Sequence, residues 1–563
     1  MTSVNRRRVF RALLATLAIV CAANLSEAVA EENDATSARC LPTKVFADPL
    51  SGPRWNGWGV DPSQRRFQPA EMAQLAAEDV PRLKLKWAFG FPGADFALAQ
   101  PTVMGGRVFI GGQSGMVYSL DANTGCTYWE FYAGPGAAVR TAVTVGQNAT
   151  GWVAYFGDVK ANVHAVDAAT GKALWKVNID SYPGARITGS PTLVGATLFV
   201  PVASSEELAG ANPLYPCCSF RGSIVALQAS TGGQLWKTYT IPEEPTARAM
   251  NSAGVQLMGP SGASVWSSPT YDAENGMIYV TTGDNYSDPP TQTSDAILGL
   301  NAVFGKLAWV RQVTPGDAFN VACVSSPPGS NCPEAKGPDL DFGSSAILVR
   351  LPSGKRALIA GQKSGVVTAV DPDRKGEVLW HTRVGRGSSL GGVQWGSAAD
   401  DNKIYVAVSD TKFSVVPPGT PGAQTSQFDW KVAWLLDRNT GGGLHALRLE
   451  SGEEVWQTPH PGCNDVLGCG QAQSAAVTAI PGIVFSGGVD GHLRAYSADD
   501  GHIVWDVDTK GEYHTVNGVA ARGGSMDGPG PVVVGGTLYV NSGYGLWGGT
   551  PGNVLLAYSV DGR

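Results

Sequence analysis

One pattern of hydrophobic and polar positions recurs along most of the chain. It consists of an apolar alternating strand, a short polar turn with a glycine, and a second strand with a tryptophan four residues after that glycine. The copies read VYSLDANTGCTYW ending at Trp129, VHAVDAATGKALW at Trp175, IVALQASTGGQLW at Trp236, ILGLNAVFGKLAW at Trp309, VTAVDPDRKGEVLW at Trp380, LHALRLESGEEVW at Trp456 and LRAYSADDGHIVW at Trp505. The copy at Trp380 has one additional turn residue.

Each copy predicts a β-hairpin. Side chains that alternate between apolar and polar indicate a strand with two different faces. Glycine allows a turn conformation that a side chain would hinder. A tryptophan in the second strand is expected to pack between neighbouring sheets, because a large ring buries much apolar surface.

An eighth copy, VLLAYSVDGR at residues 554–563, ends before any tryptophan. The segment RLKLKWAFGF at residues 82–91 contains Trp87 and has the composition of the missing strand. We therefore predict an all-β fold, an eight-bladed β-propeller of four-stranded antiparallel blades, with its ring closed by an N-terminal and a C-terminal strand. An open β-solenoid is the alternative.

The distances between successive tryptophans indicate insertions. From Trp87 onward they are 42, 46, 61, 73, 71, 76 and 49 residues, whereas one blade needs roughly 40 to 50 residues. Long insertions in a ring of blades commonly form the mouth of a site. The candidate loops are 204–222, 283–295, 315–341 and 411–430.

Composition supports the strand-rich interpretation and limits the partners. The chain has 72 glycines and 36 prolines, which favour many short strands and turns. Its net charge is −7, and removal of residues 1–30, with four arginines and one glutamate, lowers this to −10. Such acidity argues against nucleic acid or an anionic membrane surface as a partner.

The N-terminus has the pattern of an export signal. Basic residues at 6–11 precede an apolar run, Leu13–Ala23, that is too short to span a bilayer, and Ala28–Ala30 offers small residues for cleavage. A membrane anchor is the alternative, and RRVF hints at twin-arginine export. We predict a signal peptide at 1–30, a lead-in segment at 31–86 and the propeller at 87–563. The protein is expected in the periplasm, with no later membrane span.

Cleavage after Ala30 would remove Cys21 and leave eight cysteines. An even number in an oxidising compartment predicts disulfides. Cys463 with Cys469 and Cys323 with Cys332 could close small loops, which leaves the adjacent Cys217 and Cys218 for each other and Cys40 for Cys126. Sequence spacing alone does not determine this connectivity. The chain contains no CxxC and no CxxCH, which argues against a zinc ribbon and against a covalent haem.

The tryptophan-bearing repeat in an exported chain resembles the quinoprotein alcohol dehydrogenases, which use pyrroloquinoline quinone (PQQ) and calcium. The strongest match is SVWSSPTYDAENGMIYVTTGDNYSD. It implies that Trp266 lies under the quinone and that Asp284, 18 residues later, binds the metal. The family usually has asparagine there, and Asn285 follows directly. A carboxylate suits a hard cation equally well.

The segment ITGSPTLVGATLFVPVASSEELAG resembles the one that carries the family's metal glutamate. With Thr188 as a cofactor contact, the register points to Glu206, with Glu207 as the alternative. The inserted Cys217–Cys218 pair lies in this loop, whereas methanol-type enzymes carry a vicinal pair over the quinone earlier in the chain. We expect a vicinal disulfide near the cofactor.

The resemblance implies further cofactor contacts from Lys363 in GQKSGVVTAV and from Gln394 and Trp395 in GGVQWGS. A cation at Lys363 would stabilise negative charge that develops on the quinone oxygens. Arg140 could pair with a cofactor carboxylate, and Gln100 is a weaker candidate.

The catalytic base is expected in GPDLDFGSSAILV, which resembles the family's double-aspartate stretch. Asp339 aligns best, Asp341 is the alternate, and Asp317 in TPGDAFNVAC ranks third. Calcium would polarise a quinone carbonyl, the aspartate would accept the alcohol proton, and the cofactor would accept the hydride.

Electrons are expected to leave to a separate cytochrome c, because this chain lacks a haem motif. GPDLDFGSSAIL and the loop EELAGANPLYPCCSFRGS resemble the branch that oxidises polyvinyl alcohol, which implies secondary alcohols as substrates. The alternatives are a PQQ dehydrogenase for another small or polymeric alcohol, and a non-catalytic propeller scaffold.

Overall fold

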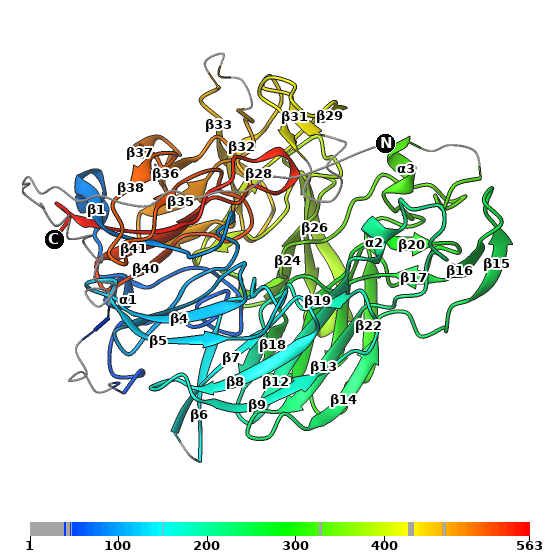
Figure 1. Cartoon of the computed structure of the whole chain (residues 1–563), viewed down its shortest axis with the longest axis horizontal. Helices are drawn as coiled ribbons and strands as arrows, with labels where there is room; N and C mark the ends of the chain where they lie inside the picture. The colour runs from blue at the N-terminus through cyan, green and yellow to red at the C-terminus, as the bar shows by residue number, and fades with distance from the viewer. Residues whose placement is uncertain are drawn as a thin grey trace, which may run out of the picture. The chain divides into compact units, whose positions relative to one another are not determined.

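Successive antiparallel sheets account for nearly all regular structure in the chain (Figure 1). The computed structural model describes residues 39–40, 46, 48–149, 151–325, 329–425, 433–463, 466 and 469–563. The predicted signal peptide, residues 1–30, lies outside the described residues. Within them, no helix is long and apolar enough to cross a membrane.

The larger sheets follow one another along the chain, each with four or five strands. The first four sheets are β2 (Thr102–Met104), β3 (Arg107–Gly111), β4 (Met116–Asp121) and β5 (Thr127–Tyr132); β6 (Thr144–Asn148), β7 (Gly151–Gly157), β8 (Asn162–Asp167) and β9 (Ala173–Asn178); β10 (Ala185–Arg186), β11 (Thr192–Val194), β12 (Thr197–Ser204), β13 (Ser223–Gln228) and β14 (Gln234–Tyr239); and β18 (Thr270–Asp272), β19 (Met277–Thr281), β21 (Ala296–Asn301) and β22 (Leu307–Gln312).

The same arrangement continues to the C-terminus. The last four sheets are β23 (Ile347–Arg350), β24 (Arg356–Gly361), β25 (Val366–Asp371) and β26 (Glu377–Arg383); β27 (Ala398–Ala399), β28 (Lys403–Val408), β32 (Gly443–Arg448) and β33 (Glu454–Pro459); β34 (Thr478–Ile480), β35 (Ile483–Gly487), β36 (His492–Ser497) and β37 (Ile503–Asp508); and β40 (Val532–Val534), β41 (Thr537–Ser542), β42 (Val554–Val560) and β1 (Leu83–Gly90).

Smaller elements lie in the connections between these sheets. The short ladders are β15 (Thr246–Met250) with β16 (Gln256–Gly259), β17 (Ser261–Gly262) with β20 (Asn285–Ser287), β29 (Phe413–Val416) and β30 (Gln424–Thr425) with β31 (Ala433–Leu436), and β38 (Glu512–Tyr513) with β39 (Ala521–Arg522). The helices are α1 (Ala70–Ala73), α2 (Glu206–Ala209) and α3 (Ala322–Ser325), and the 3-10 turns are η2 (Ala77–Arg82), η3 (Pro372–Arg374) and η4 (Leu546–Gly548).

The first strand completes the last sheet. β1 pairs antiparallel with β42, so that Leu83 lies opposite Val560 and Gly90 opposite Val554. Figure 1 shows the blue β1 beside the strands of the C-terminal sheet. The predicted pairing of residues 82–91 with the C-terminal strand is confirmed.

The repeated tryptophans occupy equivalent positions in the last strands of seven sheets. Each lies opposite a small residue, and the ladder shifts register at that point; the small residues are Ser119, Ala165, Ala226, Gly299, Ala369, Ala446 and Ala495. The indole of Trp129 donates to Ala168 O in the following sheet at 3.0 Å, and that of Trp175 donates to Ala229 O at 3.1 Å. A small residue opposite leaves room for the ring, and the indole N–H finds a partner in the next sheet.

The glycine of each motif has a second role that follows from this packing. Gly171 has a φ of +73°, and a Cβ built on it would lie 2.7 Å from Cδ2 of Trp129 in the preceding sheet. Gly232 stands in the same relation to Trp175. The turn therefore requires glycine both for its backbone conformation and for its contact with the neighbouring indole.

Apolar side chains fill the spaces between successive sheets. One cluster joins Tyr155 of β7 to Val200 of β12, and others join each later sheet to the next. A further cluster joins Val532 of β40 to Val108 and Ile110 of β3, so the last sheet packs against the first. The sequence of sheets thus returns to its start, which leaves neither end without a partner.

Four disulfides among the described residues link the cysteines in the pairs that the spacing suggested. They join Cys40 to Cys126, Cys217 to Cys218, Cys323 to Cys332 and Cys463 to Cys469. The prediction of a vicinal disulfide is confirmed, and Cys217 and Cys218 are joined by a cis peptide bond.

Candidate active site

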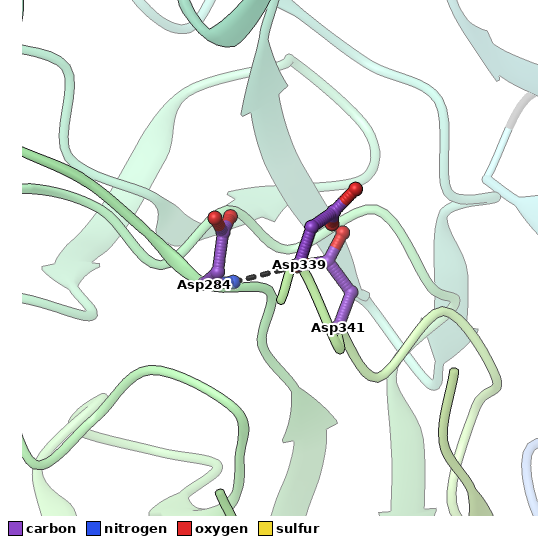
Figure 2. Close-up of side chains that lie close together, drawn as sticks. All are labelled: Asp284, Asp339 and Asp341. Carbon is purple, nitrogen blue, oxygen red and sulfur yellow. Dashed lines mark hydrogen bonds between the residues drawn. The ribbon is translucent and has the colours of Figure 1, made fainter. Parts of the chain in front are cut away.

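Three buried aspartates form the centre of the candidate site (Figure 2). Asp284, Asp339 and Asp341 each bring a carboxylate oxygen within 4.8 Å of the others. Asp284 follows β19, whereas the other two precede β23. The backbone N–H of Asp284 donates to Asp341 Oδ1 at 2.6 Å, and Figure 2 shows this bond between the two chain segments. Asp284 Oδ2 is buried and has no hydrogen-bond partner in the described part of the chain.

Lys363 is a buried cation beside these acids. Its Nζ donates to Asp339 Oδ1 at 2.8 Å and to Asp341 Oδ2 at 3.0 Å. Burial acts to lower the pKa of Lys363, but the two aspartates outweigh it and raise that pKa above the usual value. The amine therefore stays protonated, and it lies 5.6 Å from the centroid of the Trp266 ring.

The acids outnumber this cation. Burial raises the pKa of Asp284, and the charge of Asp341 raises it further. The pKa of Asp339 is also raised, first by burial, although Lys363 opposes the shift. Carboxylates so close together in a dry environment ionise fully only when another positive charge compensates them. The donor set, all hard oxygens with one unpaired carboxylate atom, fits a cation such as Ca²⁺.

The two adjacent glutamates of α2 have different environments. Glu206 accepts hydrogen bonds from the hydroxyls of Tyr182 and Tyr215 and from the backbone N–H groups of Ser219 and Phe220, the last two at 2.7 Å each. Its carboxylate therefore fastens the loop that carries Cys217 and Cys218.

Glu207 instead lies close enough to the acidic cluster for its pKa to be affected by those charges. Its pKa is raised to about 7 by burial and by the charges of Asp341 and Asp317, against the opposing effect of Lys363. A helix places consecutive side chains about 100° apart, so only one of the two glutamates can point to the aspartates. Of the pair, Glu207 is the one whose surroundings suit a metal ligand.

Asp317 and Asn285 have structural partners. Asp317 accepts hydrogen bonds from the backbone N–H groups of Leu340, at 2.8 Å, and Asp339, at 3.2 Å, and so holds the segment that bears the aspartates. The Asn285 side chain donates to Ser261 O and accepts from the backbone of Thr291. Gln100 is likewise engaged, because it donates to Gly57 O and Trp58 O and accepts from Arg66.

An aromatic wall lies beside the aspartates. Trp266 and Trp395 meet edge to face with ring centroids 5.3 Å apart. Trp395 Nε1 donates to Asp527, which also accepts from Ser474. Gly343, two residues after Asp341, has no space for a side chain because the Trp266 ring and the Gln394 carbonyl lie against it. The segment that bears Asp339 and Asp341 therefore packs directly on the Trp266 ring.

Two arginines and a threonine form a cationic part of the site. Arg140 donates to the Tyr544 hydroxyl at 2.8 Å. Arg186 Nε and Thr188 Oγ1 are buried without a hydrogen-bond partner among the described residues. Burial, with the nearby charge of Arg140, lowers the pKa of Arg186 to about 10. Unpaired donors beside two arginines fit a polyanionic ligand such as PQQ.

The vicinal disulfide packs against β20, the strand that begins directly after Asp284. Cys217 and Cys218 are buried in the cluster that contains Tyr286, which follows Asn285 in β20. The Asn320 amide lies 3.7 Å from Cys217 Sγ. The backbone N–H of Met258 donates to Cys217 O at 2.9 Å, and that of Cys218 donates to Met258 O at 3.2 Å.

Three residues of this region, Arg186, Asp295 and Asp527, were not among the site residues predicted from the sequence. Arg186 lies two residues before Thr188 in ARITGSP, so both side chains fall on the same side of an extended segment. Both carboxylate oxygens of Asp295 are buried and unpartnered within the described residues, and its pKa is raised by burial and by Asp341. No local motif in the sequence indicates that Asp527 accepts a hydrogen bond from Trp395.

Comparison with known proteins identifies the class. Residues 55–334 match the family described as "Glucose/ethanol/alcohol dehydrogenase, beta-propeller domain", and residues 363–522 and 440–563 match "Outer membrane protein assembly factor BamB". The structure superposes on a quinohemoprotein alcohol dehydrogenase from Pseudomonas putida HK5 with a TM-score of 0.64 at 18% identity, covering 93% of this chain and 83% of that one. A europium-containing methanol dehydrogenase gives a TM-score of 0.64 at 16% identity over 91% and 99%. These likenesses confirm the all-β propeller fold of quinoprotein dehydrogenases.

The relatives with similar sequences indicate a narrower class of enzyme than the structural likenesses do. A polyvinylalcohol dehydrogenase from a Pseudomonas species is 43% identical over 91% of this chain and 78% of that protein. A second, from a Sphingopyxis species, is 39% identical over 94% and 80%. The chain belongs to the family of PQQ-dependent alcohol dehydrogenases, with polyvinyl alcohol dehydrogenases among its relatives.

Proposed function

We propose that this enzyme oxidises secondary alcohol groups, in particular those of polyvinyl alcohol, to ketones with PQQ and Ca²⁺. The observation that carries the proposal is the buried group of Asp284, Asp339 and Asp341, with Lys363 between the acids and the Trp266 ring. The 43% and 39% identical relatives named polyvinylalcohol dehydrogenase support the substrate class.

Each residue has a proposed role. Asp284 and Glu207 would ligate the cation, with Glu206 holding the disulfide loop. Trp266 would lie flat against the cofactor, with Trp395 and Gln394 beside it. Arg140, Arg186 and Thr188 would bind the cofactor's acidic groups. Asn285 would fix the loop after Asp284 through its bonds to Ser261 and Thr291.

The proton transfer would be carried out by the chain's own residues. When bound, PQQ activated by the cation supplies the two-electron acceptor for the carbinol hydride. Asp339 would accept the hydroxyl proton, with Asp341 as the alternative base. Lys363 would hold the Asp339 carboxylate in place and stabilise nearby negative charge. The buried position of these groups would keep water out and strengthen the electrostatic interactions.

The wider setting of the reaction completes the proposal. The electrons would pass to a separate cytochrome c, and the enzyme would work in the periplasm after removal of residues 1–30. We propose also that the eight larger sheets are the eight blades of one ring, with the repeated tryptophans joining neighbouring blades. The cluster between Val532 and Val108 and the β1–β42 pairing support that arrangement.

The experiment is a reconstitution. The purified protein is mixed with PQQ and Ca²⁺, and dye reduction is followed with methanol, secondary alcohols, 1,3-diols and polyvinyl alcohol. Secondary alcohols and the polymer should react faster than methanol. A preference for methanol or ethanol over every secondary alcohol would overturn the substrate class, and no reduction with any alcohol would overturn the proposed reaction.

A further inference from the structure

A separate cavity of about 540 Å³ is lined in part by Cys217 of the vicinal disulfide. Its lining includes Cys217, Arg248, Met250, Met258, Ser287 and Asn331, and we name it the hairpin groove. Of the described residues, neither the three clustered aspartates nor Lys363 lines it. The volume lies in the range of roughly 300–1,000 Å³ that is typical of ligand sites.

Two insertions build this groove. One is the hairpin of β15 and β16, which Figure 1 shows beside β17 and β20. The other is the segment 329–334, which contains Cys332 of the Cys323–Cys332 disulfide. The Asn251 amide donates to Asn331 Oδ1 at 2.8 Å, and Ser252 N donates to Gly329 O at 2.6 Å. These bonds tie the two insertions together, so the groove exists before any ligand arrives, which reduces the ordering cost of binding.

The groove is adjacent to the catalytic region. Met258 on one wall is bonded through its backbone to Cys217. Ser287 on the lining belongs to β20, which begins directly after Asp284. A chain molecule that occupied the groove would therefore lie a short distance from the proposed reaction centre.

The lining combines apolar and polar groups. Met250 is 63% exposed although it is a large apolar side chain, and with Met258 it offers an adaptable apolar surface. Hydrogen-bond donors and acceptors in the same cavity come from Arg248, Ser287, Asp288, Glu334 and Lys336. An uncharged chain with a hydrocarbon backbone and a hydroxyl on every second carbon matches this mixture. A single small alcohol would leave most of the space unfilled.

We propose that the hairpin groove binds a segment of polyvinyl alcohol next to the segment that reacts. This inference rests on the proposed function for its ligand. Contacts remote from the reacting carbon can align a polymer and raise kcat/KM, and a short alcohol cannot use them. The groove is thus a specificity site for long substrates and takes no part in the chemical step.

The test compares Met250→Asp with Phe304→Asp. Both replace an exposed apolar side chain by the same charge, and Phe304, 76% exposed, does not line the groove. In native gels that contain polyvinyl alcohol, the wild type and Phe304→Asp should be retarded relative to polymer-free gels, and Met250→Asp should lose this retardation. With cofactor present, Met250→Asp should raise the polymer KM about tenfold, as loss of one well-buried apolar anchor does, and leave the kinetics of a short secondary alcohol unchanged.

Three results would overturn the inference. Met250→Asp could keep full retardation and an unchanged polymer KM. It could slow the short alcohol as much as the polymer, which would place Met250 in the reaction centre. It could impair only reduction of a cytochrome, which would make the groove a protein-docking surface. Because gel retardation does not require PQQ, it tests the groove even if alcohol oxidation itself fails.

Discussion

Asp284 donates its backbone N–H to Asp341 Oδ1, although 57 positions separate the two residues in the chain. The bond fixes the segment after β19 against the segment before β23. Asp341 also accepts a hydrogen bond from Lys363, so one carboxylate connects the proposed metal ligand Asp284 to the buried cation of the site. Hydrogen bonds that hold the two segments together keep the acids at a separation that a cation can bridge.

Replacement of the proposed metal ligand should remove cation dependence. Asp284→Ala should need about 10–100-fold more Ca²⁺ for half-maximal activity, because a ligand is lost from the donor set, and its circular dichroism should match the wild type. Calcium titration of alcohol-dependent dye reduction measures this. Asp499→Ala, whose side chain is 94% exposed, is the control. Full activity of Asp284→Ala without added calcium would exclude Asp284 from the metal site.

Substitutions of the two aspartates before β23, Asp339 and Asp341, should lower kcat to different extents. Asp339→Asn should retain bound PQQ and lower kcat by about 10²–10⁴-fold, since the proton acceptor is lost. Asp341→Asn should lower kcat less. Cofactor content comes from the PQQ absorbance and kcat from dye reduction. If Asp341→Asn proves to be the more damaging change, the base is Asp341.

Substitutions of the neighbouring glutamates should also have different effects. Glu206 should affect the stability of the fold, and Glu207 should affect metal binding. Glu206→Gln should lower the free energy of unfolding by about 1–3 kcal/mol, because the amide replaces an acceptor of several hydrogen bonds and brings an N–H group toward other donors. Its calcium requirement should change little.

Glu207→Gln should raise the calcium requirement about 10–100-fold. Without metal it should be no less stable than the wild type, since a half-buried carboxylate near the charge of Asp341 is removed. Denaturant unfolding and calcium titration of both variants provide the measurements. A normal calcium requirement for Glu207→Gln together with a raised one for Glu206→Gln would assign the ligand to Glu206.

Arg186 should act on the cofactor and not on the fold. Arg186→Gln should weaken PQQ binding by about 10–100-fold, the equivalent of one charge-assisted hydrogen bond. The cofactor-free variant should melt no lower than the wild type, because a buried guanidinium with a lowered pKa gives way to a neutral group. PQQ titration by fluorescence quenching and thermal unfolding measure the two effects. Arg350→Ala, at an exposed ion pair, is the control, and unchanged PQQ affinity of Arg186→Gln would remove Arg186 from the site.

The fold could be predicted from the sequence because the signals for each hairpin are local and are repeated along the chain. A hairpin needs alternation, a turn glycine and a tryptophan within about thirteen residues, as in VHAVDAATGKALW. The eighth, incomplete copy at the C-terminus and the strand at 82–91 were sufficient to predict the β1–β42 pairing. The same information could not show that Gly171 also fits against Trp129, because that contact joins different hairpins.

The sequence by itself determined the strand-rich repeat and the candidate acids, and its spacing suggested the cysteine pairs that the structure then settled. Only the tertiary structure decided how the side chains at the site are directed. It bonds Glu206 to the disulfide loop and brings Glu207 close enough to the aspartates to be affected by their charge, and it brings Arg186, whose Nε has no hydrogen-bond partner among the described residues, near Arg140. The physical reason is that hairpins form from neighbouring residues, whereas burial, charge and hydrogen bonding at the site arise from loops of different sheets that meet only when the apolar faces between the sheets have packed.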